Sequence, residues 1–223
     1  MIFDKILHRE KLFPKHVLAL FSFIFIFWTF YRYLPEPPVW VSELILKPIV
    51  WLVPTFWLIK KIEKQPLTSV GITKKNLLPA FYWGIGLGIV FILEGLLTNV
   101  LAFKGFQLTT SEFSLLSFLA AIVLSFATAI SEEIVFRGYI FNRLRHFWKK
   151  AWRANFLSSL LFVLVYLPVA IFVLGYTPWL MLVYLVFVFI FSLASGFVFS
   201  RTNNIVASIL LHVFWSWPVI LFR

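Results

Sequence analysis

The stretch "SLLSFLAAIVLSFATAISEEIVFRG", residues 114–138, places a long apolar run directly before two adjacent carboxylates and an arginine. Residues 114–136 can cross a bilayer as a helix, because a transmembrane helix needs about 20 mostly apolar residues. Glu132, Glu133 and Arg137 then lie at the end of this predicted span. An ionisable group at the bilayer centre costs about 2.5–3.5 kcal/mol on insertion scales, so such residues are candidates for function.

The composition of the whole chain predicts a membrane protein. Of its 223 residues, 61% are hydrophobic and only 13% are charged, and the mean hydropathy is +0.94. A soluble domain keeps about a quarter of its residues charged, because its surface must face water. We therefore expect an all-α, polytopic transmembrane helical bundle that forms a single membrane domain over residues 1–223.

Seven apolar segments are predicted to span the bilayer, at about 16–34, 38–59, 79–103, 114–136, 154–175, 178–200 and 204–222. Basic loops and loops poor in lysine and arginine alternate along the chain. Positive residues collect in cytoplasmic loops, which predicts a cytoplasmic amino terminus and an outside carboxyl terminus. This rule also explains the net charge of +11 without nucleic acid. The segment 104–116 is predicted to form an amphipathic helix at the outer interface, with Ser111 or Ser114 as its N-cap.

Three further ionisable residues fall inside the predicted spans. Glu43 precedes Lys47 by four residues, which is the favoured order for a helical ion pair. We interpret the two as a self-neutralised structural pair near the interface. Glu94 has no evident partner nearby in the sequence, and we also interpret it as structural. The absence of cysteine excludes disulfides, thiolate metal ligands and a cysteine nucleophile.

The carboxylates at 132 and 133 are predicted to have different roles. On a helix, Glu133 and Arg137 share a face and can pair. Glu132 lies about 100° around the helix, so the same arginine does not easily hold both carboxylates. Glu132 then remains available as a general base acting on water. The competing interpretation is a solvated, inert cap that marks the end of a helix.

The last predicted span contains His212, which favours the first interpretation. His212 lies eight residues after Asn204, about two helical turns into the span, and Ser216 follows on the same face. Either side chain could donate a hydrogen bond to an oxyanion, and His212 could instead assist proton transfer.

These residues resemble the signatures of a known family. "EEIVFRG" at 132–138 is similar to the first motif, EExxxR, of the CPBP membrane proteins. This family includes the CAAX prenyl endopeptidases, the bacteriocin-processing and self-immunity proteins, and the bacterial Abi group. The resemblance covers residues 114–222. It implies a catalytic core in that range and a cell-membrane location, which for the bacterial branches is the prokaryotic plasma membrane.

Two positions depart from the motifs of that family. Its second motif is Phe-x-x-x-His, whereas this chain has Phe162 followed by Tyr166. Its third motif is His-x-x-x-Asn or Asp, whereas His212 is followed here by Ser216. Tyr166 and Ser216 can still donate hydrogen bonds. Tyrosine does not easily replace histidine as a proton shuttle, because its ordinary pKa is about 10 and that of histidine about 6.5.

The resemblance implies roles for the matching residues. Glu132 would activate water, with Glu133 and Arg137 as its orienting neighbours and His212 as an oxyanion donor. We predict an intramembrane endopeptidase whose polar site, near the cytoplasmic side, brings together 132–137, 166 and 212–216. Its substrate would be a peptide or a membrane-anchored protein, its surroundings the lipid bilayer, and neither a metal nor another cofactor is predicted.

Two other functional classes stay open. A non-catalytic scaffold, immunity or regulatory protein could bind a partner in the same groove, and the missing second-motif histidine supports it. A small transporter would use Glu43 and Glu94, but the sequence has no visible inverted repeat.

Overall fold

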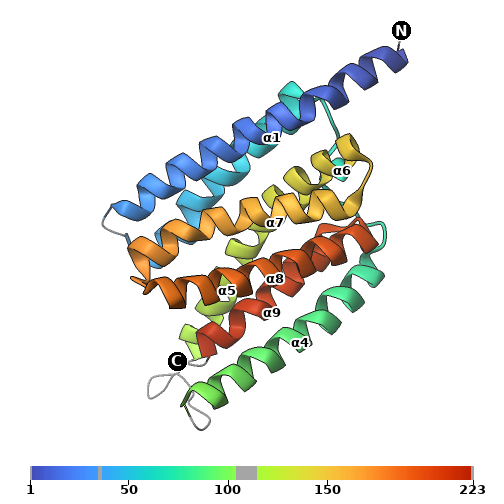
Figure 1. Ribbon diagram of the computed structural model, residues 1–223. Coiled ribbons are helices and arrows are strands. Elements are labelled where there is room, and N and C mark those ends of the chain that lie inside the picture. Colours follow the sequence, from blue (N-terminus) through green and yellow to red (C-terminus); the bar gives the residue numbers. More distant parts are fainter. Residues whose placement is uncertain (1, 35–36, 104–114, 222–223) are drawn as a thin grey trace.

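The computed structural model describes residues 2–34, 37–103 and 115–221, and every regular element within these ranges is helical (Figure 1). Six segments are long and apolar enough to cross a membrane, and Ile205–Trp217 forms a shorter apolar helix. The prediction of an all-α polytopic bundle is therefore confirmed. Residues 104–114, where the interfacial helix was predicted, lie outside the described ranges.

The first transmembrane segment is the long helix α1 (Ile2–Tyr33), and the second is wound in several short pieces. These pieces are α2 (Val39–Val41), η1 (Ser42–Leu46), η2 (Pro48–Leu52), α3 (Val53–Trp57) and η3 (Leu58–Ile62), followed by the short turn η4 (Leu67–Val70). Pro48 and Pro54 each lack a backbone N–H donor, which interrupts the regular α-helical ladder. The π-helical turn η1 ends shortly before Pro48, η2 begins at Pro48, and η3 follows Pro54 by one turn.

The central segment begins as α5 (Leu115–Glu133), continues as the π-helix η5 (Ile134–Phe141) and ends with α6 (Asn142–Trp148). The remaining elements are α4 (Leu77–Phe103), α7 (Ala151–Pro168), η6 (Val169–Val173), α8 (Pro178–Thr202) and α9 (Ile205–Leu221). All side chains from 131 to 144 are buried. The central segment is therefore surrounded by other helices over this length, and the motif at 132–138 lies in the core.

The helices α4 and α9 lie side by side although they are far apart in the sequence (Figure 1). Glycines on α4 allow this close approach. A Cβ atom at Gly84 would lie 2.7 Å from the carbonyl oxygen of Ala207, and one at Gly88 would lie 2.6 Å from the ring of Phe214. Close packing against α4 holds α9, and with it His212, against the bundle.

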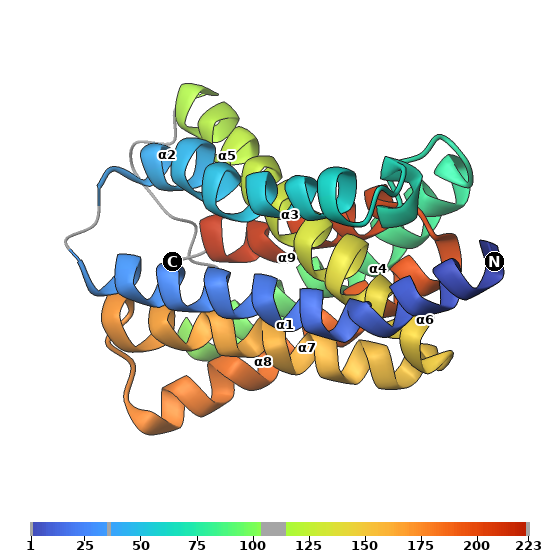
Figure 2. The same ribbon diagram turned by 90° about the horizontal axis from the view of Figure 1, so that it is seen from above.

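The start of α1 and the end of α9 lie at opposite ends of the bundle (Figure 2). The start of α1 lies at the same end as the turn between α6 and α7. We call this end the basic end, because the connections there carry Lys64, Lys74, Lys75, Lys149 and Lys150. This arrangement agrees with the alternation of loop charges, and the positive-inside rule predicts that the basic end faces the cytoplasm.

The loop between η4 and α4, residues 71–76, fixes the start of α9, and we call this loop the strap. Gly71 has a left-handed φ of +79°, which places its carbonyl oxygen 3.0 Å from the Ile205 backbone N–H. The Asn204 side-chain amide donates to the carbonyls of Thr73 and Lys75 at 2.9 and 2.8 Å. The side-chain oxygen of Asn204 also accepts from the backbone N–H of Val206 at 3.0 Å, which makes it the N-cap of α9.

Gly138 is a position where the fold needs the absence of a side chain. A Cβ atom there would lie 2.8 Å from the carbonyl oxygen of Val70. We expect Gly138→Ala to lower the free energy of unfolding by about 1–3 kcal/mol, because an added methyl group overpacks a filled core. The measurement is thermal unfolding of the purified protein in detergent. Gly86→Ala is the matched control, since a Cβ there meets nothing within 4 Å; equal melting temperatures for both variants would contradict the packing argument.

Candidate active site

Glu133 is held at the end of α5 by three neighbours. Arg137 Nε lies 3.2 Å from Glu133 Oε2, which confirms the predicted pair. The Ser195 hydroxyl donates to the same oxygen at 2.6 Å, and His212 Nδ1 lies 2.7 Å from Oε1. The carboxylate is fully buried, so each of these contacts replaces hydration that the charge has lost.

Arg137 is itself fixed by aromatic and backbone contacts. Its guanidinium lies 4.3 Å from the centroid of the Phe162 ring and 5.6 Å from that of Phe191. One terminal nitrogen donates to the carbonyl oxygen of Ser192 at 3.2 Å. Cation–π contacts strengthen when they are shielded from water. Phe162, the first residue of the altered second motif, therefore stacks on the arginine of the first motif.

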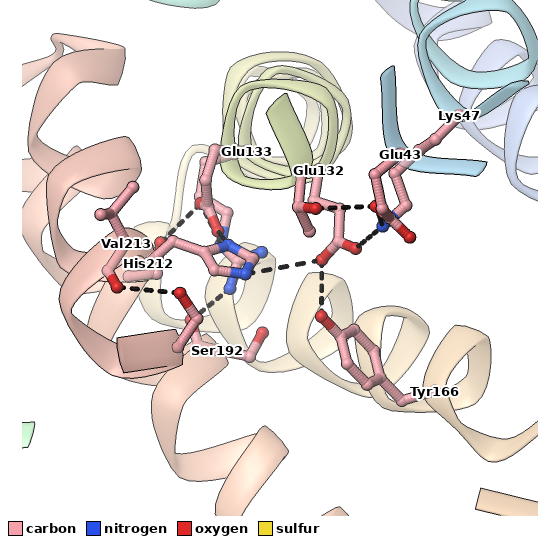
Figure 3. A network of polar contacts seen from close by, with 12 residues as sticks. Glu43, Lys47, Glu132, Glu133, Tyr166, Ser192, His212 and Val213 are labelled. Atoms are coloured by element: carbon pink, nitrogen blue, oxygen red, sulfur yellow. Dashed lines mark hydrogen bonds and ion pairs between the residues drawn. The ribbon is translucent and has the colours of Figure 1, made fainter. Parts of the chain in front are cut away.

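Glu132 is held by neighbours other than Arg137, as predicted, and both of its oxygens are engaged. Lys47 Nζ donates to Oε1 at 2.8 Å, and the Tyr166 hydroxyl donates to Oε2 at 2.7 Å. Figure 3 shows the Glu132 carboxylate between the side chains of Lys47 and Tyr166. Glu132 is 3% exposed. The residues 132–137 are therefore not a solvated cap at a helix end.

His212 faces both carboxylates. Its Nδ1 lies close to Glu133, and its Nε2 lies 3.8 Å from Glu132 Oε2 (Figure 3). A separation of 3.8 Å is too long for a direct hydrogen bond but short enough for one water molecule to bond both atoms. Glu132, Tyr166 and His212 thus converge on one point in the bundle, as the first, second and third motif positions were predicted to do.

The structure does not bring Ser216 to this point. Its hydroxyl donates to the backbone carbonyl of Val213 at 2.8 Å, within its own helix. Serine side chains commonly form such local bonds in helices, where the carbonyl of the preceding turn is the nearest acceptor. The prediction of Ser216 as a second oxyanion donor is therefore not supported. Helical spacing from His212 correctly placed Ser216 on one face but did not account for this nearer partner.

From the sequence, Lys47 was interpreted only as the structural partner of Glu43, but it also contacts the site. The predicted pair with Glu43 exists, with Nζ 2.6 Å from Glu43 Oε2, but the same ammonium also binds Glu132. The Thr128 hydroxyl donates to Glu43 at 2.7 Å, which joins this pair to α5 as well. The pair is thus part of the site. The available signal was the depth of Lys47, two helical turns inside an apolar span.

A cavity of about 190 Å³ adjoins Glu132, Lys47 and Tyr166. Its other walls are Trp28, Arg32, Glu43, Thr128, Val165 and Val169. The span was predicted to end at 136, but the helical segment continues to Trp148, so Glu132 lies near its middle. The cavity extends from Glu132 toward the end opposite the basic end. The position of the site near the cytoplasmic side stays a prediction.

Glu94, the remaining ionisable residue of the predicted spans, does not line the cavity. Glu94 accepts a hydrogen bond from Thr98 at 3.0 Å within α4, consistent with a structural role. Within the described part of the chain, no group of three or more histidine, aspartate or glutamate side chains is arranged to hold a metal ion.

Comparison with known families finds a match to part of the chain. A family model described as type II CAAX prenyl endopeptidase Rce1-like matches residues 114–218. This range includes Glu132, Glu133, Tyr166 and His212, and it confirms the resemblance drawn from the motifs. The first three transmembrane segments precede the matched range, and the second of them contributes Lys47 and Glu43. Among curated proteins, no match to the chain is found.

Lys47 offers a test of the buried charge network. We expect Lys47→Met to lower the free energy of unfolding by about 3–5 kcal/mol, because removing one partner leaves buried carboxylates without their cation. The comparison is with Lys60→Met in the same helical segment, whose lysine is exposed and whose loss should change the melting temperature little. Melting temperatures in detergent measure both effects. A Lys47→Met variant as stable as Lys60→Met would show that Lys47 does not balance Glu43 and Glu132.

Proposed function

Because residues 114–218 match a family model described as type II CAAX prenyl endopeptidase Rce1-like, we propose that this protein is an intramembrane endopeptidase that uses a glutamate-activated water. The observation that carries this proposal is the convergence of Glu132 Oε2, the Tyr166 hydroxyl and His212 Nε2 beside a polar cavity. Its substrate is a peptide or a membrane-anchored protein chain.

Glu132 acts as the general base. A water molecule bonded to Oε2 gives its proton to the carboxylate while its oxygen attacks the carbonyl carbon of the scissile peptide bond. The tetrahedral intermediate then collapses with cleavage of the C–N bond, and the departing amine takes the proton from Glu132. Lys47 remains on Oε1 throughout and keeps the carboxylate oriented. The Tyr166 hydroxyl donates to Oε2 and positions the water relative to it.

His212 is oriented by Glu133 much as a catalytic histidine is oriented by a carboxylate. When Nδ1–H donates to Glu133, Nε2 is the nitrogen that faces Glu132. In the neutral imidazole this Nε2 is an acceptor, and in the imidazolium it is a donor. His212 can therefore take a proton from the water or from Glu132, and once protonated it can donate to the oxyanion. This exchange offsets the loss of the second-motif histidine at position 166.

A second candidate function is binding without hydrolysis. Both Glu132 oxygens already have donors, and the second-motif position holds tyrosine. A protein with these features could hold a partner segment in the cavity as a scaffold, immunity or regulatory protein. The two candidates differ in what Glu132 does: a base is needed for hydrolysis, whereas a binding protein needs only the shape and charge of the cavity.

Removal of the Glu132 carboxylate tests the base. We expect Glu132→Gln to lower kcat for cleavage of candidate membrane-anchored peptides by about 10²–10⁴-fold, the usual contribution of general-base catalysis. Glu94→Gln, a carboxylate change of the same kind on α4, should leave cleavage near the wild-type rate. Cleavage products are measured by mass spectrometry. Equal cleavage by wild type and Glu132→Gln would refute the base assignment, and a stable partner captured equally by both proteins without cleavage would favour the binding function.

Tyr166 offers a second test of the same chemistry. Tyr166→Phe removes the hydroxyl that donates to Glu132 Oε2 while keeping the ring. We expect kcat to fall by about 10- to 150-fold, since a hydrogen bond to a charged group contributes about 1.5–3 kcal/mol. Tyr166→His restores the residue of the family motif. A large gain in cleavage by Tyr166→His would show that the natural tyrosine limits the reaction, and unchanged cleavage by Tyr166→Phe would remove Tyr166 from the mechanism.

A further inference from the structure

An arginine and two aromatic rings meet at the basic end of the bundle, where the start of α4 and the end of α8 lie side by side (Figure 1). The ring of Trp83 on α4 meets the ring of Phe197 on α8 edge to face, with the centroids 5.6 Å apart. The Arg201 guanidinium lies 5.0 Å from the centroid of the same Phe197 ring. None of these side chains lines the cavity beside Glu132. We call Trp83, Phe197 and Arg201 the corner cluster.

The corner cluster lies on the outside of the bundle at the depth of a membrane interface. Trp83 and Phe197 are 42% and 38% exposed, and Arg201 is exposed as well. Trp83 follows the start of the span Leu77–Thr98 by two turns, and Phe197 precedes the end of the span Pro178–Thr202 by a little more than one turn. With a rise of about 1.5 Å per residue, both rings lie about 7–9 Å inside the ends of their spans. Tryptophan is enriched at this level, where headgroups give way to acyl chains.

The strap adds two lysines to the same corner. The side-chain amide of Asn76, in the strap, donates to the carbonyl oxygen of Thr202 at 2.9 Å, and Thr202 directly follows Arg201. This bond holds the strap against the end of α8, and the bonds of the strap to the start of α9 hold it from the other side. Lys74 and Lys75 project from the strap as exposed side chains. Their backbone is therefore fixed beside the corner cluster.

These cations have no acidic partner. The sequence contains no aspartate or glutamate from 64 to 93 or from 134 to 223. Glu63, just before the first of these ranges, is buried and accepts hydrogen bonds at 2.7 Å from Tyr139 and Arg143. Among the residues that the structure describes, no carboxylate lies within ion-pair distance of the exposed cations at 74, 75 and 201. The corner therefore presents uncompensated positive charge next to exposed aromatic rings.

We propose that the corner cluster and the strap form a binding site for the headgroup of an anionic phospholipid. The planar guanidinium of Arg201 donates paired hydrogen bonds to the phosphate oxygens, a geometry that suits this side chain. Lys74 and Lys75 add positive charge from the water side of the headgroup. The exposed rings of Trp83 and Phe197 contact the acyl chains where these leave the headgroup. The cytoplasmic leaflet carries a negative surface potential from its anionic lipids, and the positive-inside rule predicts that the basic end faces this leaflet.

The combination of charge and exposed rings favours a lipid over a soluble anion. A soluble anion uses only the cations, whereas a phospholipid also covers the apolar rings directly below them. The basic end offers one related contact for comparison. The Arg153 guanidinium lies 5.3 Å from the ring of Trp152, but both residues belong to α7. The corner cluster instead joins two helices and has the strap beside it, so it can surround a headgroup on more than one side.

Loss of the Arg201 charge tests the site. The full chain is purified in a neutral detergent and titrated with phosphatidylglycerol, and native mass spectrometry counts the bound lipids. We expect Arg201→Gln to weaken binding of the first phosphatidylglycerol about fivefold, because one basic residue near anionic lipid contributes about 1 kcal/mol. Arg153→Gln is the matched control, since it removes an exposed arginine that also stands over a tryptophan at the basic end. Its affinity for phosphatidylglycerol should stay close to that of the wild type.

Three results would overturn the proposal. Equal weakening by Arg201→Gln and Arg153→Gln would indicate diffuse attraction to the whole basic end, and equal affinity of the wild type for phosphatidylglycerol and phosphatidylcholine would remove the role of charge. Displacement of the lipid by an equal concentration of glycerol phosphate would assign the site to a soluble anion. The double variant Lys74→Gln with Lys75→Gln, for which a loss of at least about fivefold is expected, replaces Arg201→Gln if that variant does not fold. Lipid counting needs no hydrolysis, so its outcome is independent of the proposed peptidase function.

Discussion

Two adjacent carboxylates in a lipid-immersed core each require a cation, and this requirement organises the bundle. The central segment supplies Arg137 for Glu133, whereas Lys47 for Glu132 comes from the second transmembrane segment, 85 residues away in the sequence. Uncompensated charge in a medium of low dielectric is costly, so these pairs bind the helices to each other. Tyr166, Ser195 and His212 complete the hydrogen bonding from α7, α8 and α9, so four segments besides the central one meet at this pair of side chains.

Local spacing accounts for the parts of the site that the sequence predicted. The Glu133–Arg137 pair follows from four-residue helical spacing, and the approach of His212 to Glu132 follows from the family motifs. The Lys47–Glu132 contact has no local signal, because Glu43 offered a sufficient partner four residues away. Ser216 shows the opposite error, since a residue on the correct face took a nearer acceptor in its own helix.

The fold was predictable in outline because apolar length and loop charge decide the number and direction of the helices. The depth of the site was not, because it depends on where the central segment ends. An apolar run that stops at Phe136 places the carboxylates at a membrane surface, but buried polar partners allow the helix to continue through Arg143 to Trp148. Hydropathy counts Arg143 as a loop residue, whereas the structure pairs it with Glu63 inside the bundle.

The hydrogen bonds of Asn204 connect the strap to the start of α9, the helix that carries His212. Asn204 holds the carbonyls of Thr73 and Lys75 and also caps α9, and His212 lies two turns further along that helix. The lysine-bearing loop and the His212–Glu132 contact are therefore connected through one continuous helix, whose start is fixed by hydrogen bonds to that loop.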